Sequence, residues 1–120
     1  MLSIELPENK KIYFASDNHL GAPTVAESKP REAKFVQWLN TIKADAGAIF
    51  LLGDLFDFWF EYKMVVPKGF VRTLGKLAEL RDSGIPIYFF VGNHDLLSTK
   101  SYLYRCFCRK SQSFVTRVCM

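Results

Sequence analysis

Three short apolar runs, each ending in polar residues, constrain the fold of this chain more than any other feature. They span residues 11–16 (KIYFAS), 46–54 (AGAIFLLGD) and 85–93 (IPIYFFVGN). Runs that are apolar on both faces are typical of buried strands in a parallel sheet. Between them, residues 29–44 and 66–84 carry apolar side chains at helical spacing. The pattern predicts an α/β fold of βαβαβ order, with parallel strands and right-handed crossovers.

Capping residues predict where the two helices begin and end. Ser28 precedes Pro30 by two positions and is predicted to be the N-cap of the first helix, with Pro30 in the first turn. Gly84 follows the second helical pattern and is predicted to be the C′ residue that stops it. The aromatic segment 56–62 (FDFWFEY) then falls in a loop. We expect its rings to serve mainly in core or lid packing.

Each predicted strand ends beside residues that can bind a metal ion. Asp17 and His19 follow the first strand, Asp54 ends the second, and Asn93 ends the third. Ligands collect beyond the carboxyl ends of parallel strands, so these three loops are expected to converge at one edge of the sheet. Side chains two apart in an extended chain share a face, which predicts that Asp17 and His19 chelate one ion. Asp54 has two oxygens with which to bridge that ion to a second, bound by Asn93.

The donor atoms in this cluster indicate which metals and which chemistry to expect. Carboxylate, imidazole and amide ligands suit Mn²⁺, Fe²⁺ or Zn²⁺, and two such ions about 3.5–4 Å apart can clamp a phosphate. Each motif alone has an ordinary structural explanation, because Asp-Asn pairs are common in turns and Gly-Asp often follows a strand. Their joint placement at three successive strand ends favours the metal site.

The same residues resemble the calcineurin-like metallophosphoesterase superfamily. The blocks "DNH", "GDLFD" and "GNHD" are similar to the first three blocks of that family's pattern, D-x-H, GD-x-x-D and GNH[DE]. More narrowly, "SDNHLG", "LLGDLFDFWFEY" and "GIPIYFFVGNHD" resemble bacterial UDP-2,3-diacylglucosamine hydrolases. The resemblance covers about residues 10–95 and implies the N-terminal half of an αββα sandwich. It also implies a pyrophosphate hydrolase of lipid A biosynthesis that uses two divalent ions, Mn²⁺ foremost, and a nucleotide-lipid substrate.

The resemblance further assigns roles to residues that follow the third strand. His94 stands where the family has a phosphate-contacting residue and is expected to act as a general acid. Asp95 is expected to orient His94, and both are therefore predicted catalytic residues. Asp57 is expected to support the site rather than to bind a metal directly.

The family pattern is incomplete in this chain. The lone His and the GH-x-H block that complete it are absent, because the chain has only two histidines. Residues 96–120 hold five Lys or Arg, no acid and all three cysteines. We expect a truncated metallophosphoesterase domain over residues 1–96 and an atypical basic tail over residues 97–120, read in a shifted frame or ending a truncated gene. On this hypothesis the metal site is incomplete and the chain alone has little or no hydrolase activity.

Composition bears on location and on the other classes of function. No apolar run approaches the roughly 20 residues of a membrane span, and the N-terminus has acids and a proline where a signal peptide would be basic and then apolar. The expected location is cytoplasmic, and the resemblance implies peripheral association with the inner membrane. Only the basic tail suggests a nucleic-acid binder, and no nucleic-acid partner is expected. The remaining alternatives are another calcineurin-like phosphodiesterase or phosphatase and a catalytically inactive remnant.

Overall fold

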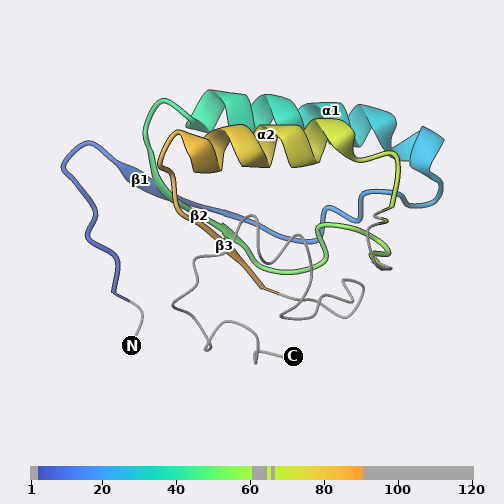
Figure 1. Ribbon diagram of the computed structural model, residues 1–120, viewed down its shortest axis with the longest axis horizontal. Helices are drawn as coiled ribbons and strands as arrows, with labels where there is room; N and C mark the ends of the chain where they lie inside the picture. Colours follow the sequence, from blue (N-terminus) through green and yellow to red (C-terminus); the bar gives the residue numbers. More distant parts are fainter. Residues whose placement is uncertain (1–2, 61–64, 66, 91–120) are drawn as a thin grey trace.

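The computed structural model describes residues 3–60, 65 and 67–90 of the chain (Figure 1). Three strands form one parallel sheet in the order β1-β2-β3, and two helices connect them. The elements are β1 (Lys11–Ala15), α1 (Val25–Ile42), β2 (Ala46–Leu51), α2 (Val71–Asp82) and β3 (Ile87–Phe89). The predicted α/β fold of βαβαβ order is confirmed. Residues 91–93, which end the third predicted strand, lie outside the described residues.

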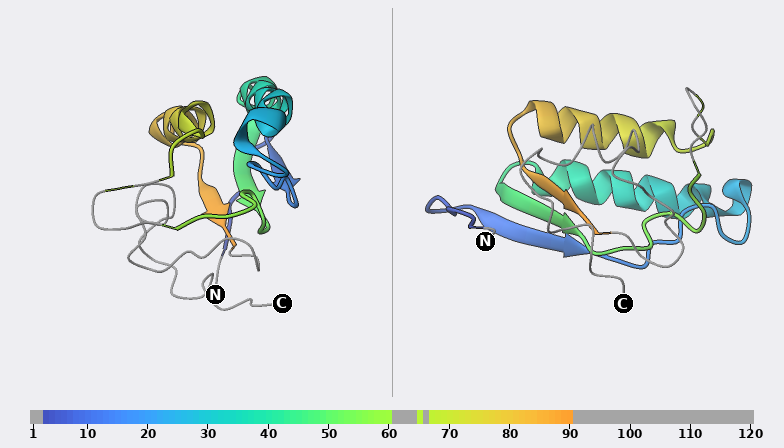
Figure 2. Two further views of the ribbon diagram at one scale, coloured as in Figure 1. Left: turned by 90° about the vertical axis from the view of Figure 1, so that its right-hand side faces the viewer. Right: turned by 60° about the horizontal axis from the view of Figure 1, so that its bottom comes forward.

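Both helices pack on the same face of the sheet (Figures 1 and 2). Two right-handed crossovers that add strands in one direction place both connecting helices on one side. The core lies between these two layers, and its buried members from the strands and helices are Ile49, Leu51, Ile87, Phe89, Phe35, Leu39, Leu77 and Leu80. One sheet with one helix layer is consistent with part of a metallophosphoesterase fold.

The helix-free face of the sheet carries a row of aromatic rings. Phe14 on β1 stacks on Phe50 of β2 at 5.2 Å between ring centroids, and Phe50 stacks on Tyr88 of β3 at 4.7 Å. Phe14 is 60% exposed, whereas Tyr88 is buried. The rings fall on one face because successive side chains of a strand alternate between its two faces. An exposed apolar side chain on this face agrees with the sequence, whose strands are apolar on both sides.

Helix α1 begins four residues earlier than the sequence predicted. Thr24 is its N-cap, and the Thr24 hydroxyl accepts a hydrogen bond from the Glu27 N–H at 3.1 Å. The same hydroxyl donates to the Glu27 carboxylate at 2.8 Å, so this pair closes the first turn. The prediction of Ser28 as the cap is wrong, because Ser28 is buried within the helix and its hydroxyl accepts from the Gly21 N–H at 2.9 Å. Pro30 accordingly lies inside the helix rather than in its first turn.

A buried carboxylate connects the two helices. Glu32 of α1 is 2% exposed and accepts a hydrogen bond from the Thr73 hydroxyl of α2 at 3.1 Å. Its other oxygen lies 3.2 Å from the Lys29 ammonium group. Because both carboxylate oxygens have a partner, the charge is tolerated in the interior. This contact fixes how α2 lies against α1, close to the end of the sheet where the metal-binding residues are expected.

At the surface, two lysines hold Glu79 of α2 in its charged form. Hydrogen bonds from Lys43 at 2.9 Å and from Lys76 lower the pKa of Glu79 to about 2 from its usual 4.5. A lowered folded-state pKa contributes stability that is present above pH 4.5 and is lost as the pH falls through about 2. The effect is modest because the group is exposed and screened by solvent.

The Glu79→Gln variant is therefore expected to lose less Tm between pH 4.5 and pH 2 than the original chain. The Asp82→Asn variant removes the same charge from the end of the same helix and serves as the control. Thermal unfolding followed by circular dichroism at a series of pH values provides the measurement. If the Tm profiles of the original chain and Glu79→Gln run parallel over this range, the ion pairs contribute nothing to the acid sensitivity.

Two glycines of the second helical segment have opposite conformational demands. Gly84 has a φ of +94° and follows the C-cap Ser83, which confirms its prediction as the C′ residue. Gly75 lies inside α2 with open space where a Cβ would stand.

Gly84→Ala is expected to lower the free energy of unfolding by about 1–2 kcal/mol, because a Cβ is strained in the left-handed region. Gly75→Ala is expected to raise it by about 0.5–1 kcal/mol. Urea denaturation of both variants measures the two changes in the free energy of unfolding. If both substitutions raise it, or both lower it, the two glycines do not differ in conformation as described.

Candidate metal centre

The loops that follow β1 and β2 are held side by side by main-chain hydrogen bonds. The Asp17 N–H donates to the Gly53 carbonyl at 3.2 Å, and the His19 N–H donates to the Asp54 carbonyl at 2.9 Å. Both loops leave the carboxyl ends of adjacent parallel strands, where the sequence placed the candidate ligands. The topology of the sheet thus brings together two segments that are more than thirty positions apart in the sequence.

Three of the four predicted metal ligands lie together at this edge. Asp17, His19 and Asp54 each offer one ligand atom, and these atoms all lie within 4.8 Å of one another. The cluster is open to solvent on one side, since the Asp17 side chain is 71% exposed while that of His19 is 32% exposed. Asn93, the fourth predicted ligand, lies outside the described residues together with His94 and Asp95. Their roles stay predictions.

The backbone at the cluster adopts a conformation that side-chain-bearing residues rarely take. Asp17, His19 and Asp54 have φ values of +54°, +44° and +51°, all in the left-handed region. Each such residue costs of order 1–3 kcal/mol, and clusters of them occur at functional sites. Asp17 and His19 do meet, as predicted, but the predicted explanation is wrong, because the backbone at these residues is not extended. The two side chains approach because the chain turns at each residue, not because the strand continues.

Asp57 is placed to support His19. Its carboxylate lies 3.5 Å from His19 Nδ1, while the other ring nitrogen, Nε2, is 3.8 Å from the Asp17 carboxylate. A carboxylate behind an imidazole fixes the orientation of the ring. This placement agrees with the supporting role expected for Asp57. It leaves Nε2 as the atom directed toward the cluster.

Arg31 of α1 is a supporting residue that the sequence did not indicate. Its Nη2 donates to the His19 carbonyl at 2.9 Å and to the Ala22 carbonyl at 2.5 Å. One guanidinium thus holds the loop that follows His19 against the start of the helix. No local pattern predicts this contact, because it depends on where α1 begins and on how the loop turns back over it.

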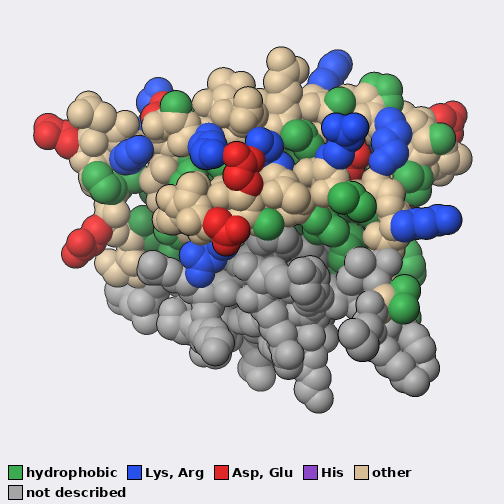
Figure 3. Space-filling view, turned by 45° about the horizontal axis from the view of Figure 1, so that its top comes forward, with side chains coloured by type: hydrophobic (Ala, Val, Ile, Leu, Met, Phe, Trp, Pro, Cys, Tyr) green, Lys and Arg blue, Asp and Glu red, His purple; other side chains and the backbone are tan. Residues whose placement is uncertain are grey.

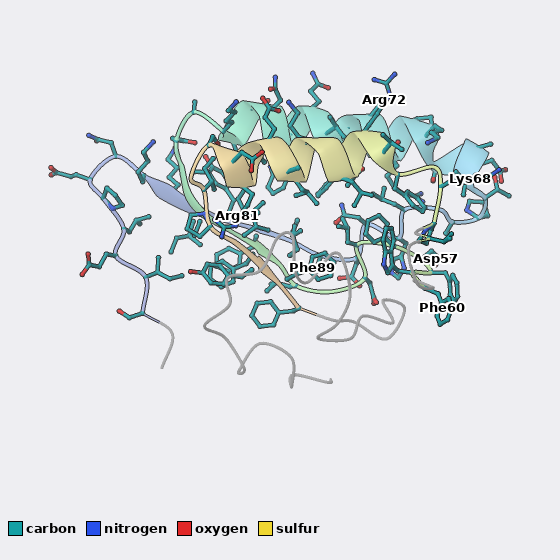
Figure 4. The ribbon with its side chains drawn as sticks, viewed as in Figure 1. Asp57, Phe60, Lys68, Arg72, Arg81 and Phe89 are labelled. Carbon is teal, nitrogen blue, oxygen red and sulfur yellow. The ribbon has the colours of Figure 1, made fainter. Side chains whose placement is uncertain are left out.

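The segment after Asp54 alternates between buried and exposed rings. Phe56 and Trp59 are fully buried, and their ring centroids are 4.5 Å apart. Phe58 and Phe60 are 61% and 55% exposed. Figure 4 shows Phe60 beside Asp57, at the same end of the molecule as the start of α2. Core packing is thus confirmed for two of the rings, whereas the other two are exposed, and one of these, Phe60, lies beside Asp57.

Comparison with known proteins identifies the family. The model of the calcineurin-like phosphoesterase family matches residues 10–118 of the chain. This chain belongs to that family. The match extends past residue 95, where the motifs that carry the resemblance end.

Three relatives of this calcineurin-like phosphoesterase share one name. A UDP-2,3-diacylglucosamine hydrolase of Porphyromonas gingivalis is 53% identical over 89 residues, which cover 74% of this chain and 34% of the relative. The protein of that name from Actinobacillus succinogenes is 36% identical over 102 residues, covering 80% of this chain and 39% of the relative. One from Edwardsiella ictaluri is 37% identical over 93 residues, covering 78% and 34%. The chain thus spans about a third of the length of these curated relatives.

The residues of the cluster fit the divalent metal that the family implies. Two carboxylates and one imidazole are donors that borderline and hard divalent cations accept, and the described residues near them include no thiolate. Two strained loops hold these donors close together, so little rearrangement is needed to bind an ion. This calcineurin-like phosphoesterase therefore carries a candidate metal site formed by Asp17, His19 and Asp54.

Replacing Asp57 tests whether it supports the metal site. Asp57→Asn is expected to weaken divalent metal binding by about 10–100-fold, because the carboxylate that orients the His19 ring is lost. Isothermal titration with Mn²⁺ measures the affinity, and urea denaturation checks that stability is retained. A loss of stability with unchanged affinity would show that Asp57 acts on the fold and not on the site.

Proposed function

We propose that this chain contributes metal ligands to a phosphoesterase that hydrolyses the pyrophosphate bond of UDP-2,3-diacylglucosamine in lipid A biosynthesis. The gathering of Asp17, His19 and Asp54 within 4.8 Å is the observation that carries the proposal. The relative from Porphyromonas gingivalis, 53% identical over 89 residues and named for this substrate, supports it. The products would be UMP and a lipid-linked monosaccharide phosphate.

Each residue of the site has a separate task in this reaction. Asp17 and His19 would hold one divalent ion, Asp54 would contribute its carboxylate to that ion and to a second, and Asn93 would help to hold the second. Mn²⁺ is the metal we propose, with Fe²⁺ or Zn²⁺ as alternatives. When bound, such ions supply Lewis-acid polarisation of a phosphoryl oxygen and neutralise its charge.

The chain's own side chains would manage orientation and proton transfer. Asp57 keeps the His19 ring turned toward the cluster, at the observed 3.5 Å from Nδ1. His94 donates a proton to the leaving phosphate oxygen, and Asp95 orients His94. In-line displacement at phosphorus requires mainly positioning and charge stabilisation, so no nucleophilic Ser or Cys is needed.

The exposed rings beside the cluster suit the lipid part of this substrate. Phe58 and Phe60 are more than half exposed, and Phe60 lies beside Asp57, which contacts His19 of the site that would bind the polar head. Such a surface is consistent with acyl chains and with peripheral association with a membrane from the cytoplasmic side. No helix among residues 3–60 and 67–90 is both long and apolar enough to span a bilayer. We further propose that the catalytic domain ends near residue 96 and that residues 97–120 form a separate basic tail.

A hybrid protein tests the proposed function directly. The 89 aligned residues of the Porphyromonas gingivalis relative are replaced by those of this chain, and release of UMP is measured with Mn²⁺. The hybrid is expected to hydrolyse UDP-2,3-diacylglucosamine, whereas the 120-residue chain alone turns over little or none. Asp54→Asn in the hybrid is expected to abolish release, with Asp82→Asn as the control of equal charge change.

The same assay separates the proposal from its alternatives. A folded hybrid that cleaves a simple phosphodiester but not the nucleotide-lipid would favour another calcineurin-like phosphodiesterase. A folded hybrid that cleaves neither substrate would indicate a catalytically inactive remnant. Activity that survives Asp54→Asn would place the chemistry elsewhere and overturn the metal-site assignment.

A further inference from the structure

The turn formed by residues 19–22 carries the imidazole of the metal cluster and is bonded to the loop after β2. The His19 N–H donates to the Asp54 carbonyl at 2.9 Å, and the Leu20 N–H donates to the Leu55 carbonyl at 2.9 Å. His19 has a φ of +44°, a conformation that persists only where the surrounding structure holds it. The position of this turn therefore depends on the elements packed against it.

Helix α1 bonds the same turn from a second direction. Ser28 and Arg31 lie three positions apart, so their side chains share one face of the helix. The Ser28 hydroxyl accepts a hydrogen bond from the Gly21 N–H at 2.9 Å. Arg31 Nη2 donates to the His19 carbonyl at 2.9 Å and to the Ala22 carbonyl at 2.5 Å. Three main-chain groups of the turn thus have partners on one helix.

The main chain and the ring of His19 are held by different residues. Its N–H is bonded to the loop after β2 and its carbonyl to Arg31, so the backbone is fixed from both sides. Its ring is oriented by the Asp57 carboxylate, 3.5 Å from Nδ1. The direction of Nε2 toward the cluster requires both, because a ring can be aimed only from a backbone that stays in place.

The charge of Arg31 cannot itself favour a metal ion. Arg31 is exposed, and Lys and Arg side chains are spread over the helix layer, with fewer Asp and Glu (Figure 3). A cation near a metal site repels the metal ion, so this guanidinium opposes binding by its charge. Any contribution of Arg31 to metal binding must come from its two hydrogen bonds to the turn.

We propose that Ser28 and Arg31 are positioning residues of the metal site, which hold the turn after His19 against α1 and keep the imidazole directed at the cluster. They act through the main chain of the turn. The inference rests on the metal site of the proposed function and adds to it a contribution from helix α1. The helix thereby becomes part of the site, although the three clustered ligands lie on the two loops.

Variants of Arg31 in the full 120-residue chain test the inference through the affinity for Mn²⁺. Arg31→Met keeps a long side chain that favours a helix but donates no hydrogen bond. It is expected to bind Mn²⁺ about tenfold more weakly, whereas loss of the charge alone would strengthen binding. Arg31→Lys keeps a donor and is expected to recover part of the affinity. Lys34→Met removes an equal charge one turn along α1 and is expected not to weaken binding.

Isothermal titration gives these affinities, and urea denaturation checks that each variant is folded. Amide hydrogen exchange without metal provides a second measurement. Arg31→Met is expected to speed exchange of the Ala22 N–H by about tenfold or more, because the turn loses a bond to a charged donor. Ser28→Ala is expected to do the same to the Gly21 N–H. Exchange of both amides in Lys34→Met is expected to match the original chain.

Three outcomes would overturn the inference. The first is equal Mn²⁺ affinity of Arg31→Met and Lys34→Met. The second is unchanged exchange of both amides in Arg31→Met and Ser28→Ala. The third is a loss of stability in Arg31→Met without a loss of affinity, which would assign the residue to the fold alone.

The release of UMP by the hybrid protein separates this inference from the proposed function. Weaker Mn²⁺ binding by Arg31→Met, together with a hybrid that does not cleave the nucleotide-lipid, would support the positioning role and reject the substrate. A hybrid that cleaves it, together with unchanged affinity of Arg31→Met, would do the reverse. A chain that binds no Mn²⁺ would refute the positioning role together with the metal site.

Discussion

Replacing Trp59 with alanine is expected to lower the free energy of unfolding by about 3–5 kcal/mol, the largest loss of stability we expect from one substitution. Trp59 is fully buried, and its ring packs at 4.5 Å from Phe56 and 6.2 Å from Phe70. The three rings connect the loop after β2 to the start of α2. Removal of the Trp59 ring leaves a cavity in a small domain whose total stability is only about 5–15 kcal/mol.

Phe58→Ala is the matched control for this prediction. Phe58 precedes Trp59 by one residue, but its side chain is 61% exposed. Its loss is expected to change stability by less than about 0.5 kcal/mol, as for most surface substitutions. Urea denaturation followed by circular dichroism measures both variants. Similar losses in the free energy of unfolding for Phe58→Ala and Trp59→Ala would contradict the description of Trp59 as buried and Phe58 as exposed.

The pattern of apolar runs was sufficient to predict the sheet. Runs that are apolar on both faces and separated by helical stretches leave few arrangements other than parallel strands with helical crossovers, and β1, β2 and β3 follow that order. The end of α2 was predictable too, because Gly84 marks a conformation that residues with a Cβ avoid. These features depend on local chemistry repeated along the chain.

The start of α1 was not predictable in the same way. Both Thr24 and Ser28 have a side-chain oxygen that can cap a helix. Because proline is common in the first turn, Pro30 favoured Ser28 as the predicted cap. The loop before the helix determines which residue is the cap, because the Ser28 hydroxyl accepts a hydrogen bond from the Gly21 N–H of that loop. That bond is tertiary, so the pattern around Pro30 could not indicate it.

The convergence of the metal ligands was predictable, but its geometry was not. Parallel topology alone brings Asp17, His19 and Asp54 to one edge. Their left-handed backbone conformations arise from hydrogen bonds between the two loops, such as that from the His19 N–H to the Asp54 carbonyl. The role of Arg31 could not be predicted from the sequence either, because its hydrogen bond to the His19 carbonyl joins a helix to a loop. Sequence patterns describe the elements, whereas these contacts depend on how the elements meet.

Replacing Asp54 with asparagine is expected to weaken binding of Mn²⁺ to the chain by about 100-fold or more, since even the loss of a residue that only supports a metal ligand costs 10–100-fold. Asp54 is the ligand that the second loop contributes to the cluster with Asp17 and His19. Asparagine keeps the shape of the side chain and tolerates the φ of +51° found here, so the backbone need not change. The variant thus removes the charge and leaves the loop intact.

Titration calorimetry with Mn²⁺ on the chain, first freed of metal with a chelator, gives the affinity of each variant. Asp82→Asn carries the same change of charge at the exposed end of α2 and is expected to bind Mn²⁺ as the original chain does. Circular dichroism checks that both variants are folded. Equal affinities of Asp54→Asn and Asp82→Asn would mean that the three clustered side chains do not form the metal site. Loss of binding in Asp54→Asn but not in Asp82→Asn would mean that Asp17 and His19 do not hold the ion without the carboxylate that the second loop contributes.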